Sequence, residues 1–411
     1  MLGLSLRLPL PAVLAEREYG LRPLLQRLKD LDPVLLVVTA CLLVWGLAMV
    51  ASASVAVAEE NTGNTLYYFY RQLAYAALGL GVAWFVFQIE LESWKNNGFL
   101  LLAVSMLLLL IVFLPALGHT VNGAQRWVNL GIIKLQVSEP ARLFLVIYLA
   151  SYIVRRRTEL SLDFWGMVKP MVPISVAGAL MLLQPDYGAV AILLAVTMIT
   201  LFLAGARILH STLLVGTAAA GLAFLAITSP YRLRRLTSFS NPWEDPYNSG
   251  FQLSQALIAI GRGEWSGVGF GNSVQKLMYL PETHTDFVYA VLAEEFGLLG
   301  SLCLLGLFGL LIWRGFVIAG KALENGLYFG GYMAYALASW IGLQAFINIA
   351  VNMGVLPTKG LTLPLMSYGG SSLVVVCVLI ALLLRVDFET RRFAGESKAA
   401  KQRREAREAV A

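Results

Sequence analysis

Long apolar segments recur along the whole chain and constrain its fold more than any other feature. A segment of about 20 apolar residues crosses the hydrocarbon of a bilayer as a helix. Ten such segments occur, at residues 34–57, 68–89, 98–117, 138–154, 167–184, 187–206, 211–229, 286–314, 328–352 and 366–385. Only 14% of the residues are charged, against about 25% in soluble domains. The sequence therefore predicts an all-α integral membrane protein with about ten transmembrane helices.

One polytopic membrane domain accounts for most of the chain. We expect a cytoplasmic N-terminal segment at 1–33, the membrane domain at 34–392 and a charged cytoplasmic tail at 393–411. Residues 230–285 form a long loop between the seventh and eighth predicted spans. The N-terminus lacks the order of basic, apolar and small residues that marks a cleaved signal peptide, so we expect the first span to remain in the mature protein.

The distribution of Lys and Arg predicts the orientation of the chain. Basic residues precede the first predicted span and follow the second, fourth, sixth and tenth spans. The positive-inside rule then places both termini in the cytoplasm and the 230–285 loop on the extracytoplasmic side. The net charge of +6 is explained by this anchoring and does not indicate nucleic-acid binding.

The run Leu280-Pro281-Glu282-Thr283-His284-Thr285-Asp286-Phe287 places polar side chains where the long loop meets the eighth predicted span. A carboxylate at this boundary between water and hydrocarbon is costly to desolvate, so Asp286 is a candidate functional residue. The alternative is that Asp286 only caps the following helix, for which Asp is a favoured residue. His284 would either assist Asp286 or bind a loop carbonyl.

Basic residues also gather in the segments predicted to lie outside. Arg presents a planar fork to phosphate oxygens and Lys a point charge, so these residues suit a phosphate-bearing substrate. They are Arg126, Lys134, Arg232, Arg234, Arg235, Arg262, Lys276 and Lys359. The long loop also contains Glu244, Asp245, Glu264 and Glu282, so a merely solvated loop is the alternative.

Two further pairs of charged residues lie at the starts of predicted spans. Glu139 and Arg142 are three residues apart and share one helical face. They form either a second polar site or a structural ion pair that lets a polar helix end enter the membrane. Glu294 and Glu295 follow Asp286 by two turns, and we interpret them as structural or regulatory groups in preference to cation ligands.

Together these motifs resemble the SEDS family (shape, elongation, division and sporulation). The run 280–287, followed by Ala293-Glu294-Glu295 and Gly297, is similar to the family signature, and 367–372 (Ser-Tyr-Gly-Gly-Ser-Ser) belongs to the shared pattern. Three other stretches resemble the cell-division branch, namely 241–246 (Asn-Pro-Trp-Glu-Asp-Pro), 271–276 (Gly-Asn-Ser-Val-Gln-Lys) and 356–364 (Leu-Pro-Thr-Lys-Gly-Leu-Thr-Leu-Pro). The resemblance extends from about Asp32 to Arg392.

The resemblance implies a peptidoglycan glycosyltransferase that polymerises lipid II on the outer face of the bacterial cytoplasmic membrane, at the division septum. The family's proposed catalytic aspartate matches Asp286, which would act as a general base. The candidate substrate-binding residues are Arg71, Glu139, Arg142, His284, Lys359 and Ser367. The family usually has Gln-Pro-Ser-Glu with a Lys soon after, whereas residues 136–142 here read Gln-Val-Ser-Glu-Pro-Ala-Arg, which changes both the backbone and the cation.

The resemblance also implies partners. They are a class B penicillin-binding protein of the FtsI type and the division proteins FtsQ, FtsL, FtsB and FtsN. No cofactor is firmly indicated; basic side chains or a divalent cation, Mg²⁺ or Mn²⁺, would offset the charge of a departing pyrophosphate. A lipid II flippase and a non-catalytic scaffold remain as alternatives. A scaffold could dock a partner helix on the small residues Gly330, Gly331 and Ala334.

Overall fold

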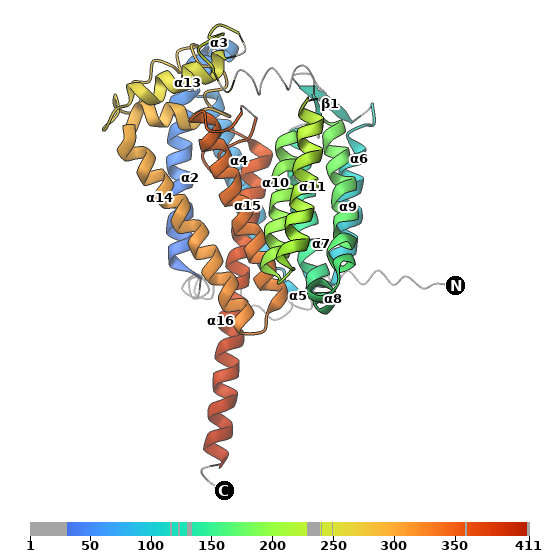
Figure 1. Cartoon of the computed structure of the whole chain (residues 1–411). Coiled ribbons are helices and arrows are strands. Elements are labelled where there is room, and N and C mark those ends of the chain that lie inside the picture. The colour runs from blue at the N-terminus through green and yellow to red at the C-terminus, as the bar shows by residue number, and fades with distance from the viewer. Residues whose placement is uncertain are drawn as a thin grey trace.

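The computed structural model describes residues 31–115, 117–121, 124–129, 134–227, 239, 241–248, 250–357 and 360–408. Most of them belong to long helices that run side by side (Figure 1). The helices are α2 (Pro33–Ala53), α3 (Val55–Thr62), α4 (Tyr67–Gln88), α5 (Leu91–Asn96), α6 (Gly98–Ile111), α7 (Ser138–Arg155), α8 (Arg157–Leu162), α9 (Phe164–Leu183), α10 (Tyr187–Leu203), α11 (Ile208–Ile227), α13 (Phe251–Arg262), α14 (Val288–Glu324), α15 (Tyr328–Asn352) and α16 (Gly370–Glu408).

Each apolar segment predicted from the sequence overlaps one of the long helices. Among the described residues, five helices are long and apolar enough to cross a membrane, namely α2, α9, α14, α15 and the Gly370–Gly395 part of α16. Helices α6 and α10 are apolar but shorter. The helical membrane fold is thus confirmed, whereas the crossing of all ten segments and the outer position of the 230–285 loop stay predictions.

The ends of several helices differ from the predicted spans. The first segment, 34–57, is divided at Ser54 into α2 and α3. The eighth continues to Glu324, and the tenth continues as helix to Glu408, through most of the predicted tail. Hydrophobicity marks where a helix enters lipid but does not mark where its hydrogen bonds end, so helices continue beyond their apolar parts.

A small sheet, which periodicity did not predict, lies at the same end of the bundle as α3 and α13 (Figure 1). Strands β1 (Gly118–Val121), β2 (Ala124–Asn129) and β3 (Lys134–Gln136) form an antiparallel sheet in the order β1-β2-β3. The backbone N–H of Gln136 donates to Oγ of Ser371 at 2.9 Å. The sheet is therefore attached to the start of α16.

Helix α14 is interrupted at Gly297, whose φ is 63° and ψ is −159°. A short helix at 288–296 precedes the break. The segment after α13 supplies the backbone partners there, since Val268 and Gly269 N–H groups donate to the carbonyls of Glu294 and Glu295, each at 3.0 Å. A Cβ at position 297 would lie 2.4 Å from the nitrogen of Gly267, so only glycine fits.

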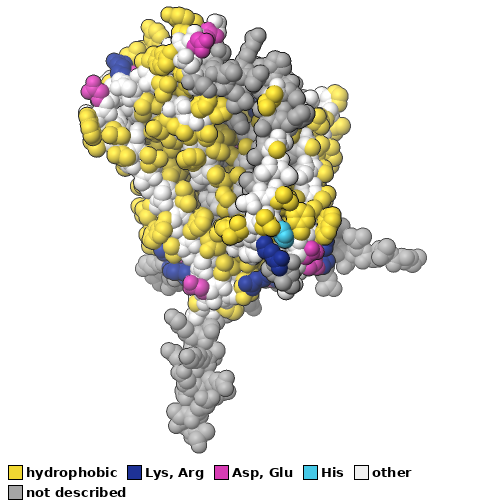
Figure 2. Space-filling model, in the orientation of Figure 1, with side chains coloured by type: hydrophobic (Ala, Val, Ile, Leu, Met, Phe, Trp, Pro, Cys, Tyr) yellow, Lys and Arg dark blue, Asp and Glu magenta, His cyan; other side chains and the backbone are white. Residues whose placement is uncertain are grey.

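Helix α15 lies among the helices that carry the candidate site residues. It packs on α7, α10, α14 and α16, and its residues are buried along most of its length. On the face shown in Figure 2, apolar side chains cover the middle of the molecule and charged side chains lie near its two ends. This distribution is what a bilayer-spanning bundle requires.

Candidate functional site

Asp286 lies two residues before α14 and is half-buried. A Cβ added to Gly360 would lie 3.1 Å from its Oδ2, so the carboxylate faces the segment that begins at Gly360. The cap residue of α14 is Phe287, which makes no side-chain capping bond. The first-turn N–H of Ala290 instead donates to Oδ1 of Asn352 at 3.2 Å. Asn352 therefore binds the first turn of α14, and the catalytic role of Asp286 stays a prediction.

His284 lies within a cluster of aromatic side chains. Its ring centroid is 4.7 Å from that of Tyr68 and 5.5 Å from that of Tyr368. Its carbonyl accepts a hydrogen bond of 2.7 Å from the N–H of Tyr368. Burial lowers the pKa of His284 below its usual 6.5, and the nearby Glu282 acts in the opposite direction. The imidazole is therefore neutral at pH 7, and its Nδ1 has no hydrogen-bond partner among the described residues.

Arg71, in the first turn of α4, lies beside the same aromatic cluster. Its guanidinium donates to the hydroxyls of Tyr67 at 3.1 Å and Tyr75 at 3.0 Å, and it lies within 6 Å of both ring centroids, at 5.6 and 5.8 Å. Tyr68, in the same helix, packs edge-on against Tyr368, with ring centroids 5.1 Å apart. Arg71 and His284, which were predicted separately, thus lie in or beside the same aromatic cluster.

Ser367 forms hydrogen bonds within the loop before α16 and with α4. Its Oγ accepts from the N–H of Leu363 at 2.8 Å, and its carbonyl accepts from Nε2 of Gln72 at 2.9 Å. Oε1 of Gln72 in turn accepts from the N–H of Gly369 at 3.3 Å. Gln72 therefore fastens this loop to α4, next to Arg71.

Glu139 and Arg142 form a buried ion pair in the first turns of α7. The Arg142 guanidinium lies over Trp340 of α15, 4.7 Å from the ring centroid. Nη1 of Arg142 and Oε2 of Glu139 have no partners within the described part of the chain. Pro140 is the third residue of α7, a position where no intrahelical N–H is required. The altered motif is accordingly compatible with a regular helix start.

Asp186 is a member of this second polar group that the sequence did not single out. Its Oδ2 accepts from Oγ of Ser138 at 2.8 Å and from Nε2 of Gln136 at 3.3 Å, while its Oδ1 accepts from the N–H of Ala189. It caps α10 and joins that helix to α7. An Asp directly after Gln184-Pro185 and before an apolar run is a capping signal that could have been recognised.

The two polar groups are linked by α15, through residues that were not predicted as site residues. Polar side chains recur there every four residues, and all are buried: Trp340, Gln344, Asn348 and Asn352. Residues four apart share one helical face, and polar groups inside a span usually face the protein interior. That spacing was a signal in the sequence. Lys359, and with it Arg232, Arg234 and Arg235, lies outside the described residues.

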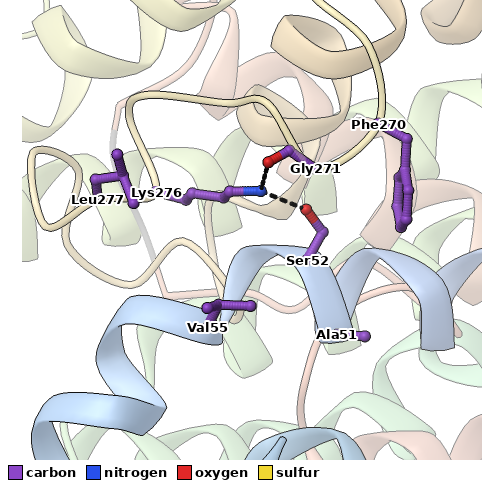
Figure 3. A pocket seen from close by; sticks show the side chains of 7 residues that line it. All are labelled: Ala51, Ser52, Val55, Phe270, Gly271, Lys276 and Leu277. Carbon is purple, nitrogen blue, oxygen red and sulfur yellow. Dashed lines mark hydrogen bonds between the residues drawn. The ribbon is translucent and has the colours of Figure 1, made fainter. Parts of the chain in front are cut away.

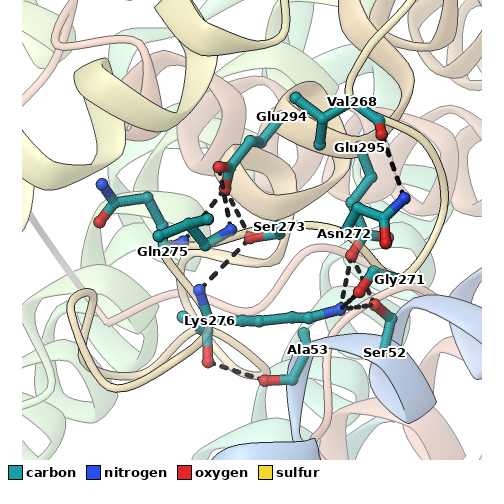
Figure 4. A network of polar contacts seen from close by, with 12 residues as sticks. Ser52, Ala53, Val268, Gly271, Asn272, Ser273, Gln275, Lys276, Glu294 and Glu295 are labelled. Atoms are coloured by element: carbon teal, nitrogen blue, oxygen red, sulfur yellow. Dashed lines mark hydrogen bonds and ion pairs between the residues drawn. The ribbon is translucent and has the colours of Figure 1, made fainter.

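Glu294 and Glu295 form a third polar network with the loop after α13 (Figure 4). Oε1 of Glu295 accepts from Nζ of Lys276 at 2.9 Å and from Oγ of Ser52 at 2.6 Å. Glu294 accepts from Arg262 at 2.8 Å and from Ser273 at 2.5 Å. Among the described residues, no three His, Cys, Asp or Glu side chains are grouped to hold a metal ion. These contacts support a structural role for both glutamates.

A cavity of about 390 Å³ lies next to this network, between the end of α2 and the loop (Figure 3). It is lined by Ala51, Ser52, Val55, Phe270, Gly271, Lys276 and Leu277. The Lys276 ammonium points to Ser52 and to the carbonyl of Gly271, at 2.8 and 2.6 Å. With Glu295, these partners use its three donors. Lys276 is one of the basic residues predicted to suit a phosphate-bearing substrate, but its ammonium is bound within the protein.

Comparison with known proteins gives consistent matches over nearly the whole chain. A family model described as cell cycle protein, for FtsW, RodA and SpoVE, matches residues 33–392. A protein of Thioalkalivibrio sulfidiphilus named probable peptidoglycan glycosyltransferase FtsW is 51% identical over 92% of this chain and 94% of its own length. A protein of the same name from Nitrosococcus halophilus is 54% identical over 88% and 93%.

Solved structures agree with this assignment. A chain from a peptidoglycan synthase complex, described as coordinating polymerization and crosslinking, is 29% identical with a TM-score of 0.71, over 88% of this chain and 98% of that one. The crystal structure of Thermus thermophilus rod shape determining protein RodA is also 29% identical, with a TM-score of 0.65 over 87% and 96%. The chain therefore belongs to the FtsW, RodA and SpoVE family, which is the SEDS family that its motifs resemble, and to the FtsW branch within it.

Proposed function

We propose that this protein is a peptidoglycan glycosyltransferase that polymerises lipid II into glycan strands for the division septum. Its FtsW relatives carry the name of that activity. The observation that carries the chemical part of the proposal is the position of Asp286. Its carboxylate faces the segment at Gly360, where the long loop meets the start of α14.

The reaction needs one base and one good leaving group. Lipid II carries its sugar α-linked to a pyrophosphate, whereas the strand is β-linked, so a single displacement with inversion joins the two. Asp286 takes the proton from the acceptor hydroxyl as that oxygen forms the new bond to the anomeric carbon. The bond from that carbon to the pyrophosphate breaks, and the lipid pyrophosphate leaves with the electron pair. A positioned general base typically contributes a factor of about 10²–10⁴ to the rate.

Arg71 and Lys359 are the cations that we assign to the pyrophosphate. Arg71 is half-buried, and its partners are neutral phenols, so its charge is not cancelled by a carboxylate among these contacts. Arg142 is paired with Glu139, and the pair offers little net charge to an anion. We therefore expect Glu139 and Arg142 to orient neighbouring groups more than to bind phosphate. A cation delivered with the pyrophosphate is compatible with this assignment but is not required by it.

A class B penicillin-binding protein of the FtsI type is the expected partner, and a relative of known structure belongs to a peptidoglycan synthase complex. The small residues Gly330, Gly331 and Ala334 cannot form the docking face, because they are buried in the chain. A Cβ at Gly330 would meet Leu91 and Val386, for example. The exposed apolar face of α14 is the better candidate, with Leu298, Leu299, Leu302, Leu305 and Trp313.

The septal location, the cytoplasmic termini and the contacts with FtsQ, FtsL, FtsB and FtsN are parts of the same proposal. The distribution of Lys and Arg supports the orientation, and the division-type motifs support the location. The FtsW relatives, which are about 50% identical to this chain, support the location and these contacts only through their name.

The deciding experiment is polymerisation of purified lipid II by the reconstituted protein, alone and with its transpeptidase. Glycan strands should form, and Asp286→Asn should prevent their formation. A scaffold would yield no polymer under either condition. A flippase would move labelled lipid II between leaflets without lengthening strands. Either of these results would reject the transferase and support the corresponding alternative.

A further inference from the structure

Asn348 and Asn352 lie one turn apart on α15 and have no role in the reaction as described above. Their exposed fractions are 2% and 0%. A buried amide is costly unless its donors and acceptor are bound. The partners of these two side chains therefore indicate why polar residues occupy the interior of a membrane helix.

Both amides bind the same backbone atom. Nδ2 of Asn348 donates to the carbonyl oxygen of Asp286 at 2.9 Å, and Nδ2 of Asn352 donates to it at 3.0 Å. A carbonyl oxygen has two lone pairs, so this acceptor is fully used. The backbone of the proposed base is thus attached to a buried helix by two hydrogen bonds.

The remaining contacts bring two more backbone segments to the same place. Asn348 also donates to the carbonyl of Leu361 at 2.5 Å. Oδ1 of Asn352 accepts from the N–H of Ala290 at 3.2 Å. The pair consequently holds Asp286, the first turn of α14 and the segment after Gly360 in one fixed arrangement. The Asp286 carboxylate faces that same segment.

The contacts continue along α15 toward α7. Nε2 of Gln344 donates to the carbonyl of Thr362 at 3.0 Å, and Nε1 of Trp340 donates to Oε1 of Gln344 at 2.9 Å. Trp340 lies under the guanidinium of Arg142. One buried face of α15 therefore contacts both Arg142, which is paired with Glu139, and the segment that faces Asp286.

We propose that Asn348 and Asn352 are positioning residues of the transferase, which fix the Asp286 carboxylate against the segment after Gly360 without touching the substrate. This proposal rests on the function proposed above. A base must lie within hydrogen-bond reach of the proton that it removes, and a displacement of about 1 Å can reduce a rate by about 100-fold. Loops are intrinsically mobile, so a loop-borne base gains precision from a buried helix.

Two variants test the proposal in the full-length protein reconstituted with its transpeptidase. Asn352→Asp keeps an acceptor for Ala290 but loses the donor to Asp286. Asn348→Ser introduces no charge and is too short to reach the Asp286 carbonyl. For each variant we expect kcat for lipid II polymerisation to fall by about 10–100-fold, with KM close to that of the parent.

Asn325→Asp is the matched control. The Asn325 amide donates to the carbonyl of Lys321 at 2.8 Å, four residues earlier and in an exposed position. The bond from Asn352 to the carbonyl of Asn348 has the same spacing, at 2.9 Å. We expect Asn325→Asp to retain the kcat of the parent. Thermal unfolding and detergent-extracted yield are measured for all variants, so that each rate refers to folded protein.

The outcomes separate the two proposals. A kcat like that of the parent in folded Asn348→Ser would overturn the positioning role, as would a raised KM with unchanged kcat. If Asn352→Asp does not fold, Asn348→Ser decides; if neither folds, the pair is required for the fold and the proposal is rejected. Asp286→Asn is assayed alongside. If it remains active, the proposed base is wrong, whereas an inactive Asp286→Asn with fully active Asn variants rejects only the positioning role.

Discussion

The Nζ of Lys276 lies 2.9 Å from Oε1 of Glu295, and both side chains are buried. Lys276 belongs to the loop after α13, and Glu295 lies near the end of the short helix at 288–296. The pair therefore fastens the loop to the helix that follows Asp286. Removing one member of such a pair leaves the other charge buried without compensation.

We predict that Lys276→Met lowers the free energy of unfolding by about 3–5 kcal/mol, because Glu295 then remains buried without its cation. The double variant Lys276→Met/Glu295→Gln should recover part of this loss. Thermal and denaturant unfolding in detergent provide the measurement. Lys95→Met is the control, since its pair with Glu92 is exposed, and it should cost less than about 1 kcal/mol. An equal loss in both single variants would contradict the assigned strength of the buried pair.

Asp286→Asn should retain insertion, folding and partner binding but lose about 10²–10⁴-fold in polymerisation rate, as expected for removal of a general base. Asp286→Glu should also be strongly impaired, because one methylene displaces the carboxylate beyond hydrogen-bond reach. Strand synthesis from labelled lipid II gives the rate. Asp163→Asn, at an exposed position before α9, serves as control. Normal turnover in Asp286→Asn would return the flippase and scaffold to consideration.

Arg71→Ala should weaken lipid II use while leaving the folded protein in the membrane, because a hydrogen bond to a charged group contributes about 1.5–3 kcal/mol. Arg71→Lys should recover only part of the affinity, since it lacks the planar fork. Binding of substrate analogues with and without the pyrophosphate is measured for the parent, for Arg71→Ala and for the exposed control Arg207→Ala. Lys359→Ala should also weaken lipid II use, and its binding is measured with the same analogues. Equal loss for charged and uncharged analogues would show that Arg71 does not act on the pyrophosphate.

The pKa of His284 is lowered below 6.5 in the folded protein, chiefly by burial. Between the folded and unfolded pKa values, the unfolded state binds more protons, so stability rises with pH there. The contribution of His284 is fully present above 6.5 and is lost as the pH falls through the folded pKa. Comparison of unfolding midpoints at pH 7.5 and pH 5.5 tests this expectation.

His284→Gln should reduce the difference between the two midpoints, whereas His210→Gln should leave it as in the parent. His210 lies against Phe164, away from the aromatic cluster. If His284→Gln changed neither midpoint difference nor stability, the neutral buried state of His284 would not control the response to acid.

The sequence predicted the helices well because each apolar run is as long as a bilayer is thick, and the structure has a helix at every such run. It did not predict β1, β2 and β3, because strands this short carry no clear periodicity. Asp286 and Arg71 were proposed as site residues from motifs. The two hydrogen bonds from Asn348 and Asn352 to the Asp286 carbonyl were not predicted. Asn348 follows Asp286 by 62 positions, and only folding brings these residues together. For the same reason, no spacing could relate Ser52 to Glu295.

The interruption of α14 at Gly297 also determines what can be done with the loop that follows α13. Glycine-rich loops are ordinarily chosen as permissive sites for epitope tags and fluorescent reporters. Here the backbone of 264–269 is hydrogen-bonded on both sides of the break, to Glu294 and Glu295 before it and to Leu298 and Leu299 after it. One added residue would shift all of these bonds out of register. A reporter belongs elsewhere, for example at the C-terminal end of α16, which projects away from the bundle (Figure 1).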